Sequence, residues 1–152
     1  MPEKRSPMSR SEMMAGIGPK NTKPEMIVRK GLHSLGFRFR LHSGHLVGKP
    51  DLVLPKYRAA VFVNGCFWHA HKGCSYFRLP KTRAEFWREK LAKNVERDQK
   101  TAQALISSGW RVLTVWECAT KHFSLEDLLS EIAGWLRGQE IFGEIPNRRE
   151  IV

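Results

Sequence analysis

The chain has 152 residues, with 41% hydrophobic and 27% charged side chains, which suits one globular domain and excludes a disordered chain. No apolar run approaches the ~18 residues of a membrane span, and the N-terminus lacks the apolar segment of a secretion signal, so we expect a cytoplasmic protein with no membrane partner. The formal net charge is +11, and residues 1–100 hold 21 of the 26 basic side chains, which predicts a nucleic-acid partner; a merely soluble basic protein is the alternative.

The N-terminal part of the chain predicts an arm, a helix and a strand. Residues 1–21 mix Pro, Ser, Lys, Arg and Met, a composition typical of a flexible basic arm. A helix is expected next, opened by a capping box of Thr22 and Glu25 and ended by Gly36. Strict alternation of apolar and basic residues over 37–41 then predicts a strand.

Further elements are expected as far as residue 138. In chain order they are strands at 51–54 and 57–64, an irregular segment at 65–81, a helix from a capping box at 82–85 to about 107, a strand at 110–116 and a helix at 124–137. Apolar strands between long amphipathic helices predict an α/β domain of three layers around a mixed sheet. We place this domain at 22–138, after the arm, and expect 139–152 to be a polar, mobile tail.

Cysteine and histidine are concentrated in the irregular segment. Cys66, His71 and Cys74 are close enough for one loop to wrap a metal ion, and Cys118 follows the last predicted strand. If that strand neighbours the strand before the loop, three Cys and one His can form a closed, tetrahedral structural zinc site. Three unrelated buried thiols are the alternative. His69 could replace His71 as a ligand, whereas a site with His71 leaves His69 free for chemistry.

Two carboxylates are candidates for nuclease chemistry. Asp51 stands at the mouth of a strand behind Pro50, and a nuclease needs such a carboxylate to hold a divalent cation against the scissile phosphate. A simple Pro-Asp turn is the alternative. Glu25 either points into the same cleft or only completes its capping box.

Large aromatic residues stand next to basic ones. Phe67, Trp68 and Trp87 have Arg and Lys neighbours, which suits stacking on bases or wedging between them. Covering a sheet edge is the alternative for these three residues. The other tryptophans fall at strand and helix periods that predict core positions; they are Trp110, Trp116 and Trp135.

Several segments together carry a resemblance to a known family. They are Gly48–Asp51, Val61–His71, Thr82–Trp87, Lys93–Asp98, Gly109–Val112 and Val115–Cys118. Over about residues 9–138 the chain resembles the very-short-patch repair (Vsr) DNA mismatch endonucleases. The resemblance implies a restriction-endonuclease-like fold and a monomeric bacterial enzyme that acts at the nucleoid. It implies nicking of duplex DNA on the 5′ side of the thymine in a T·G mismatch left by deamination of 5-methylcytosine, with functional links to a DNA cytosine methyltransferase and to mismatch-repair proteins.

The resemblance also implies roles for individual residues. Asp51 corresponds to the carboxylate that binds catalytic magnesium, Val63 offers its main-chain carbonyl to that ion, His69 activates the attacking water, and Glu25 supports the site through water. The implied zinc ligands are Cys66, His71, Cys74 and Cys118. The implied DNA contacts are a major-groove wedge of Phe67, Trp68 and Trp87, a minor-groove insertion by Met14, and base-pair contacts by Lys90 and Asn94.

Two departures from the family pattern stand in this chain. Asn64 occupies a position where the family often has His, which removes a second active-site histidine. Gly73 is an apparent insertion between two zinc ligands, and a glycine can absorb an insertion in a loop. Two other functions remain open: a non-catalytic zinc-containing DNA-binding module, which would need neither Asp51 nor His69, and a restriction-type nuclease that cuts fully paired duplex.

Overall fold

The computed structural model of the protein describes residues 22–147 and contains one five-stranded sheet. The strands lie in chain order as β1 (Arg40–Leu41), β2 (Leu52–Leu54), β3 (Ala59–Asn64), β4 (Arg111–Trp116) and β5 (Phe142–Ile145). β1, β2 and β3 pair antiparallel, whereas β3, β4 and β5 pair parallel. The mixed sheet expected from the sequence is therefore confirmed.

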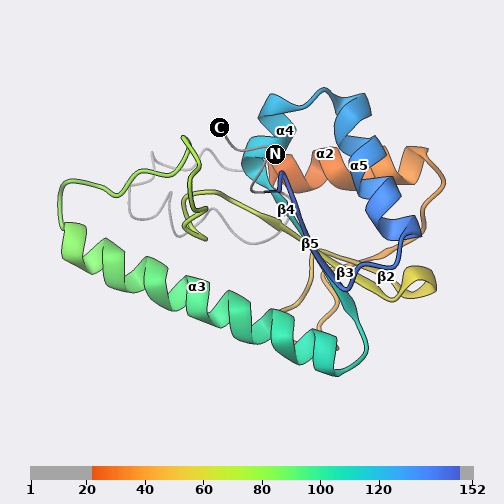
Figure 1. Ribbon diagram of the computed structural model, residues 1–152, viewed down its shortest axis with the longest axis horizontal. Helices are drawn as coiled ribbons and strands as arrows, with labels where there is room; N and C mark the ends of the chain where they lie inside the picture. Colours follow the sequence, from red (N-terminus) through yellow and green to blue (C-terminus); the bar gives the residue numbers. More distant parts are fainter. Residues whose placement is uncertain (1–21, 148–152) are drawn as a thin grey trace, which may run out of the picture.

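Helices cover both faces of this sheet (Figure 1). The long α3 (Ala84–Ser107) lies on one face, and α2 (Lys23–Ser34), α4 (Glu117–His122) and α5 (Leu125–Arg137) gather on the other. Alternate residues of β3 face opposite layers: Val61 packs in the core with α2 and α5, while Ala60 packs with Leu105 of α3. The result is the expected three-layer arrangement. Within residues 22–147, no helix has the length and apolar character needed to span a bilayer.

The N-termini of the helices show which of the predicted capping interactions form in the structure. Thr22 and Ser124 accept hydrogen bonds from backbone N–H groups three residues later, so both predicted N-caps are confirmed. The capping box expected at 82–85 is wrong, because α3 begins after Arg83 in a left-handed conformation (φ 55°) without a side-chain cap. The carboxylate of Glu25 bonds to other side chains, described below, instead of completing its box.

Three elements depart from the expected pattern. β1 spans only Arg40–Leu41 of the strand expected over 37–41. β5 lies within the segment expected to be a polar tail, and it forms by parallel pairing with β4, from Val112↔Phe142 to Val115↔Ile145. Such a strand depends on hydrogen bonds to its neighbour, which its own polar composition does not reveal. The short helix α4 was also not expected. The predicted arm over 1–21, with Met14, lies outside the described residues.

Candidate active site and metal centre

Parallel pairing of β3 with β4 assembles a cluster of cysteine and histidine. Because Asn64 pairs with Trp116, the residues two positions beyond each strand, Cys66 and Cys118, come together. One donor atom each from Cys66, His71, Cys74 and Cys118 lies within 4.8 Å of every other, and all four side chains are buried. His71, not His69, is the histidine of this cluster.

The cluster has the contacts of a prepared metal site. His71 Nδ1 lies 3.6 Å from Cys66 Sγ and 3.5 Å from Cys118 Sγ. Backbone N–H groups of Cys118 and Tyr76 donate to the sulfurs of Cys66 and Cys74, both at 3.4 Å, and such bonds stabilise metal-bound thiolates. The His71 ring stacks on Trp116 at 4.0 Å, which holds the imidazole in place. Three sulfurs and one nitrogen are a donor set that fits tetrahedral zinc.

Burial and hydrogen bonds shift the pKa values of the residues in this cluster. A hydrogen bond from the Cys66 thiol to the Cys118 side chain, together with burial, raises the pKa of Cys66 far above its usual range, and the bond donated by the Cys118 N–H opposes the rise. Burial also raises the pKa of Cys74 and lowers the pKa of His71. The two thiols and His71 therefore favour their neutral forms, and a bound cation would replace the protons of the thiols.

A second cluster lies where β1 and β2 meet. Leu41 pairs with Leu52, which sets the next residue, His42, opposite Asp51; the His42 N–H donates to the Asp51 carbonyl at 3.1 Å. His42 Nε2 lies 3.0 and 2.9 Å from the two carboxylate oxygens of Glu25. The donor atoms of Glu25, His42 and Asp51 all lie within 4.8 Å of one another. The structure thus brings Glu25 to Asp51, as expected, and adds His42, which the sequence alone did not single out.

The environment of Asp51 suits a bound cation. The Val63 N–H donates to Asp51 Oδ2 at 2.7 Å, so the end of β3 orients this carboxylate. Burial raises the pKa of Asp51 to about 7; the Val63 hydrogen bond opposes the rise and the charge of Glu25 adds to it. Two carboxylates held this close in a buried place repel each other, and a divalent cation relieves that repulsion.

A glycine shapes the approach to Asp51. Gly48 has a positive φ of 77°, and a Cβ at this position would collide with the Thr101 side chain of α3. Only glycine lets the loop before Asp51 lie this close to the helix without strain.

His69 forms a pair with a residue of α3. Its Nδ1 lies 2.5 Å from Asp98 Oδ2, and its ring meets Trp116 edge to face. A carboxylate on Nδ1 selects the tautomer whose Nε2 can accept a proton. Asp98 lay inside a segment of the family resemblance, but no local pattern distinguished it from other polar residues of the helix. His69 is not part of the cluster that contains Asp51.

The three aromatic residues expected to form a wedge are in mutual contact. Ring centroids are 5.3 Å apart for Phe67 and Trp68, 5.5 Å for Phe67 and Trp87, and 5.9 Å for Trp68 and Trp87. All three pairs are edge to face, and all three side chains are half-buried. One aromatic surface is thus shared between the loop that carries Cys66 and His71 and α3.

Asn94 and Lys90 of α3 have different environments. Asn94 Nδ2 donates to the Trp68 carbonyl at 3.0 Å, and its Oδ1 accepts from Arg97. Asn94 therefore braces the loop that carries Trp68. Lys90 is exposed on the same helix.

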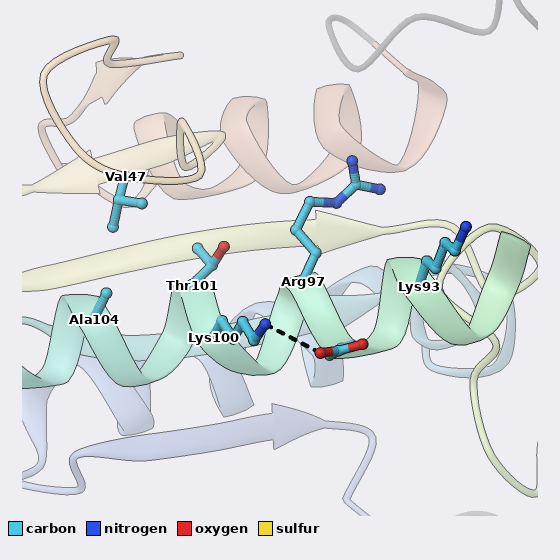
Figure 2. A pocket seen from close by; sticks show the side chains of 7 residues that line it. Val47, Lys93, Arg97, Lys100, Thr101 and Ala104 are labelled. Carbon is cyan, nitrogen blue, oxygen red and sulfur yellow. Dashed lines mark ion pairs between the residues drawn. The ribbon is translucent and has the colours of Figure 1, made fainter.

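A basic groove lies between the loop that precedes Asp51 and the helix α3. It has a volume of about 500 Å³ and lies between Val47 and α3, where Figure 2 shows Val47 over Thr101. Its other lining residues are Lys93, Glu96, Arg97, Lys100 and Ala104. Three cations against one carboxylate make this groove suited to a phosphate backbone.

Comparison with known proteins agrees with these features. The family profile "DNA mismatch endonuclease Vsr" matches residues 3–75. The chain is 48% identical to the type II nicking enzyme V.XorIIP of Xanthomonas oryzae pv. oryzae, over 78% of this chain and 86% of the relative. It is 40% identical to the DNA mismatch endonuclease Vsr of Escherichia coli K12, over 90% of this chain and 89% of the relative. This degree of identity over nearly the whole length places the chain in the DNA mismatch endonuclease Vsr family.

Proposed function

We propose that this endonuclease nicks one strand of duplex DNA on the 5′ side of the thymine in a T·G mismatch left by deamination of 5-methylcytosine, and so starts very short patch repair. The observation that carries the proposal is the combination of two site halves: the carboxylates of Glu25 and Asp51, and the pair that His69, on the loop after β3, forms with Asp98 of α3. A non-catalytic DNA-binding module would need neither half. A restriction-endonuclease-like fold is part of the proposal and is supported by the mixed sheet, with Asp51 immediately before β2.

The chemistry divides between the two halves. Asp51 and the Val63 carbonyl would hold a magnesium ion, with Glu25 beside it; when bound, the ion stabilises negative charge on the scissile phosphate. His69 takes a proton from the attacking water through Nε2. Asp98 orients the His69 ring and stabilises the imidazolium that forms.

Zinc at the four-residue cluster has a structural role in this proposal. Its ligands Cys66 and His71 bracket Phe67, Trp68 and His69 in the chain. Fixing both ends of this short loop fixes the general base and two wedge residues together. The loop has no helix or strand of its own, so the metal replaces the packing that it lacks.

Mismatch recognition is assigned to the aromatic cluster, and affinity to the basic surface. Unstacking a base step costs least where pairing is already poor, so wedges favour a T·G site over a paired one. The groove with Lys93, Arg97 and Lys100 supplies phosphate contacts that are independent of sequence. Lys90 is assigned to flanking base pairs. The arm at 1–21, with Met14, is assigned to the minor-groove side.

The proposal also covers the oligomeric state, the location and the partners of the enzyme. We propose that the enzyme acts as a monomer, because one site in a small domain cuts one strand. A cytoplasmic location, and functional links to a DNA cytosine methyltransferase and mismatch-repair proteins, complete the proposal.

The direct test of function is a strand-cleavage assay. The zinc-loaded protein is incubated with magnesium and a labelled duplex that holds one T·G pair, beside a fully paired control. We expect one nick, 5′ to the mismatched thymine. Double-strand cleavage of the paired duplex would identify a restriction-type nuclease instead, and binding without cleavage would identify a DNA-binding module.

Replacing Trp68 by Ala should separate mismatch recognition from general affinity. The preference for T·G over paired duplex should fall by roughly 10- to 100-fold, the value of one stacking contact of about 1–3 kcal/mol. Binding to paired duplex and its salt dependence should hardly change, because no cation is lost. Binding isotherms for both duplexes at several salt concentrations measure both quantities.

Phe86→Ala is the matched control for Trp68→Ala. Phe86 is exposed and contacts Trp87, but it has no assigned role in the wedge. Equal weakening of both duplexes by Trp68→Ala would show that Trp68 only packs the loop.

Replacing His69 by Ala should lower the nicking rate by roughly 10²- to 10⁴-fold, the usual contribution of a general base. Asp98→Asn should lower the rate by a similar factor, because an amide N–H facing Nδ1 selects the tautomer that carries the proton on Nε2, which then cannot accept one from water. Single-turnover rates at saturating enzyme measure both effects, with the exposed Gln99→Ala as control. Near-normal turnover of His69→Ala would remove its assigned role.

A further inference from the structure

His42 is built into the Asp51 cluster by the backbone. It follows β1 directly, its N–H bonds to the Asp51 carbonyl, and its φ of 47° lies in the left-handed region that non-glycine residues seldom adopt. Its side chain is 15% exposed, against 1% for Glu25. The imidazole is therefore held at the cation site, with limited access to solvent.

The donor atoms of this cluster lie close to one another. His42 Nε2 is 3.0 and 2.9 Å from the two oxygens of Glu25, and the chosen donors of Glu25, His42 and Asp51 are all within 4.8 Å of one another. Glu25 Oε2 is also 3.2 Å from Arg29 Nη1, which offsets part of its charge. Two carboxylates and one imidazole thus face one small volume.

The nitrogen changes which cation such a site prefers. Mg²⁺ takes oxygen ligands almost exclusively, whereas an imidazole nitrogen favours first-row transition-metal ions. Building on the proposed function, we infer that His42 is a third protein ligand of the catalytic cation and that the site binds Mn²⁺ more tightly than Mg²⁺. The competing role for His42 is a hydrogen bond that merely positions Glu25, with no contact to the cation.

Cation binding by the zinc-loaded full-length protein tests this inference. Free Mn²⁺ is followed by electron paramagnetic resonance during titration, and Mg²⁺ affinity is read by competition. We expect His42→Gln, which keeps a donor for Glu25, to weaken Mn²⁺ binding on the order of tenfold while Mg²⁺ affinity changes less than about twofold. His45→Gln is the matched control, because His45 is exposed in the following loop.

The unaltered protein provides a second readout. Pulsed electron paramagnetic resonance of bound Mn²⁺ should show coupling to a histidine ¹⁴N, which His42→Gln removes and His45→Gln retains. Absence of that coupling in the unaltered protein would overturn the inference whether or not the variant folds. Equal loss of both cations in His42→Gln would also overturn it, and would leave His42 as a positioning residue for Glu25.

Asp51→Asn separates this inference from the proposed function. If Asp51→Asn binds Mn²⁺ as well as the unaltered protein does, Asp51 is not a ligand of the cation. The metal assignment of the proposed function is then wrong. If Asp51→Asn abolishes Mn²⁺ binding while His42→Gln changes nothing, only the assignment of His42 fails.

Discussion

Asp51→Ala is expected to abolish strand nicking while the affinity for T·G duplex stays nearly intact. Asp51 is the carboxylate that the Val63 N–H orients at the end of β3, and in the proposed function its oxygens hold the cation that stabilises the transition state. The proposed function assigns DNA affinity to other groups, chiefly the basic groove and the aromatic cluster. The substitution therefore removes catalysis without removing the surface that binds DNA.

Stability should not fall with the activity of Asp51→Ala. Burial and the neighbouring Glu25 both raise the pKa of Asp51. Without a cation, an ionised Asp51 therefore destabilises the folded state. Single-turnover nicking, duplex binding without a divalent cation, and thermal melting measure the three quantities. Asp127→Ala, at an exposed site in α5, is the matched control. Turnover near that of the unaltered enzyme would refute the assignment.

Cys118→Ser is expected to remove zinc and to destabilise the whole domain. Cys118 opens α4 and lies beside Cys66 and His71, so its loss breaks the link between the β3 loop and β4. A structural zinc site contributes folding free energy directly. We expect a loss of about 3–5 kcal/mol in the free energy of unfolding, which lowers Tm by roughly 10 °C. Nicking should fall as well, because the same loop carries His69.

Elemental analysis and melting curves measure the effect of Cys118→Ser. The unaltered protein should contain one zinc per chain, and the variant far less. Lys72→Ser is the matched control, because Lys72 is an exposed residue of the same loop between two ligands. A metal-free protein that melts at the temperature of the zinc-containing one would remove the structural role.

Local signals predicted most of the elements correctly. The apolar run at 59–63 became a central strand, and the N-caps Thr22 and Ser124 began their helices where expected. These signals involve only three or four neighbouring residues, so a short segment of the sequence is enough to predict them. One failure had a non-local cause, because β5 pairs with the distant β4. The other was the capping box at 82–85: α3 begins after Arg83 without a side-chain cap.

Some features of the site were likewise predictable from the sequence, and others depended on the folded structure. Residue types and spacing were enough to propose Cys66, His71, Cys74 and Cys118 as ligands, since the loop uses soft donors at short intervals. Residue types and spacing left His69 as an alternative to His71, and the family resemblance favoured His71. In the folded loop, His71 is the histidine that lies against the sulfurs.

By itself, the sequence determined which chemical groups this protein has and which short segments become helices and strands, because propensity, caps and apolar periods are local properties. The tertiary structure alone decided which groups meet. Strand register set His42 opposite Asp51, and parallel pairing of β3 and β4 set Cys66 beside Cys118. Packing of α3 against the loop gave His69 its Asp98 partner. Register and packing depend on hydrogen bonds and contacts between distant residues, so no local window of the chain contains them.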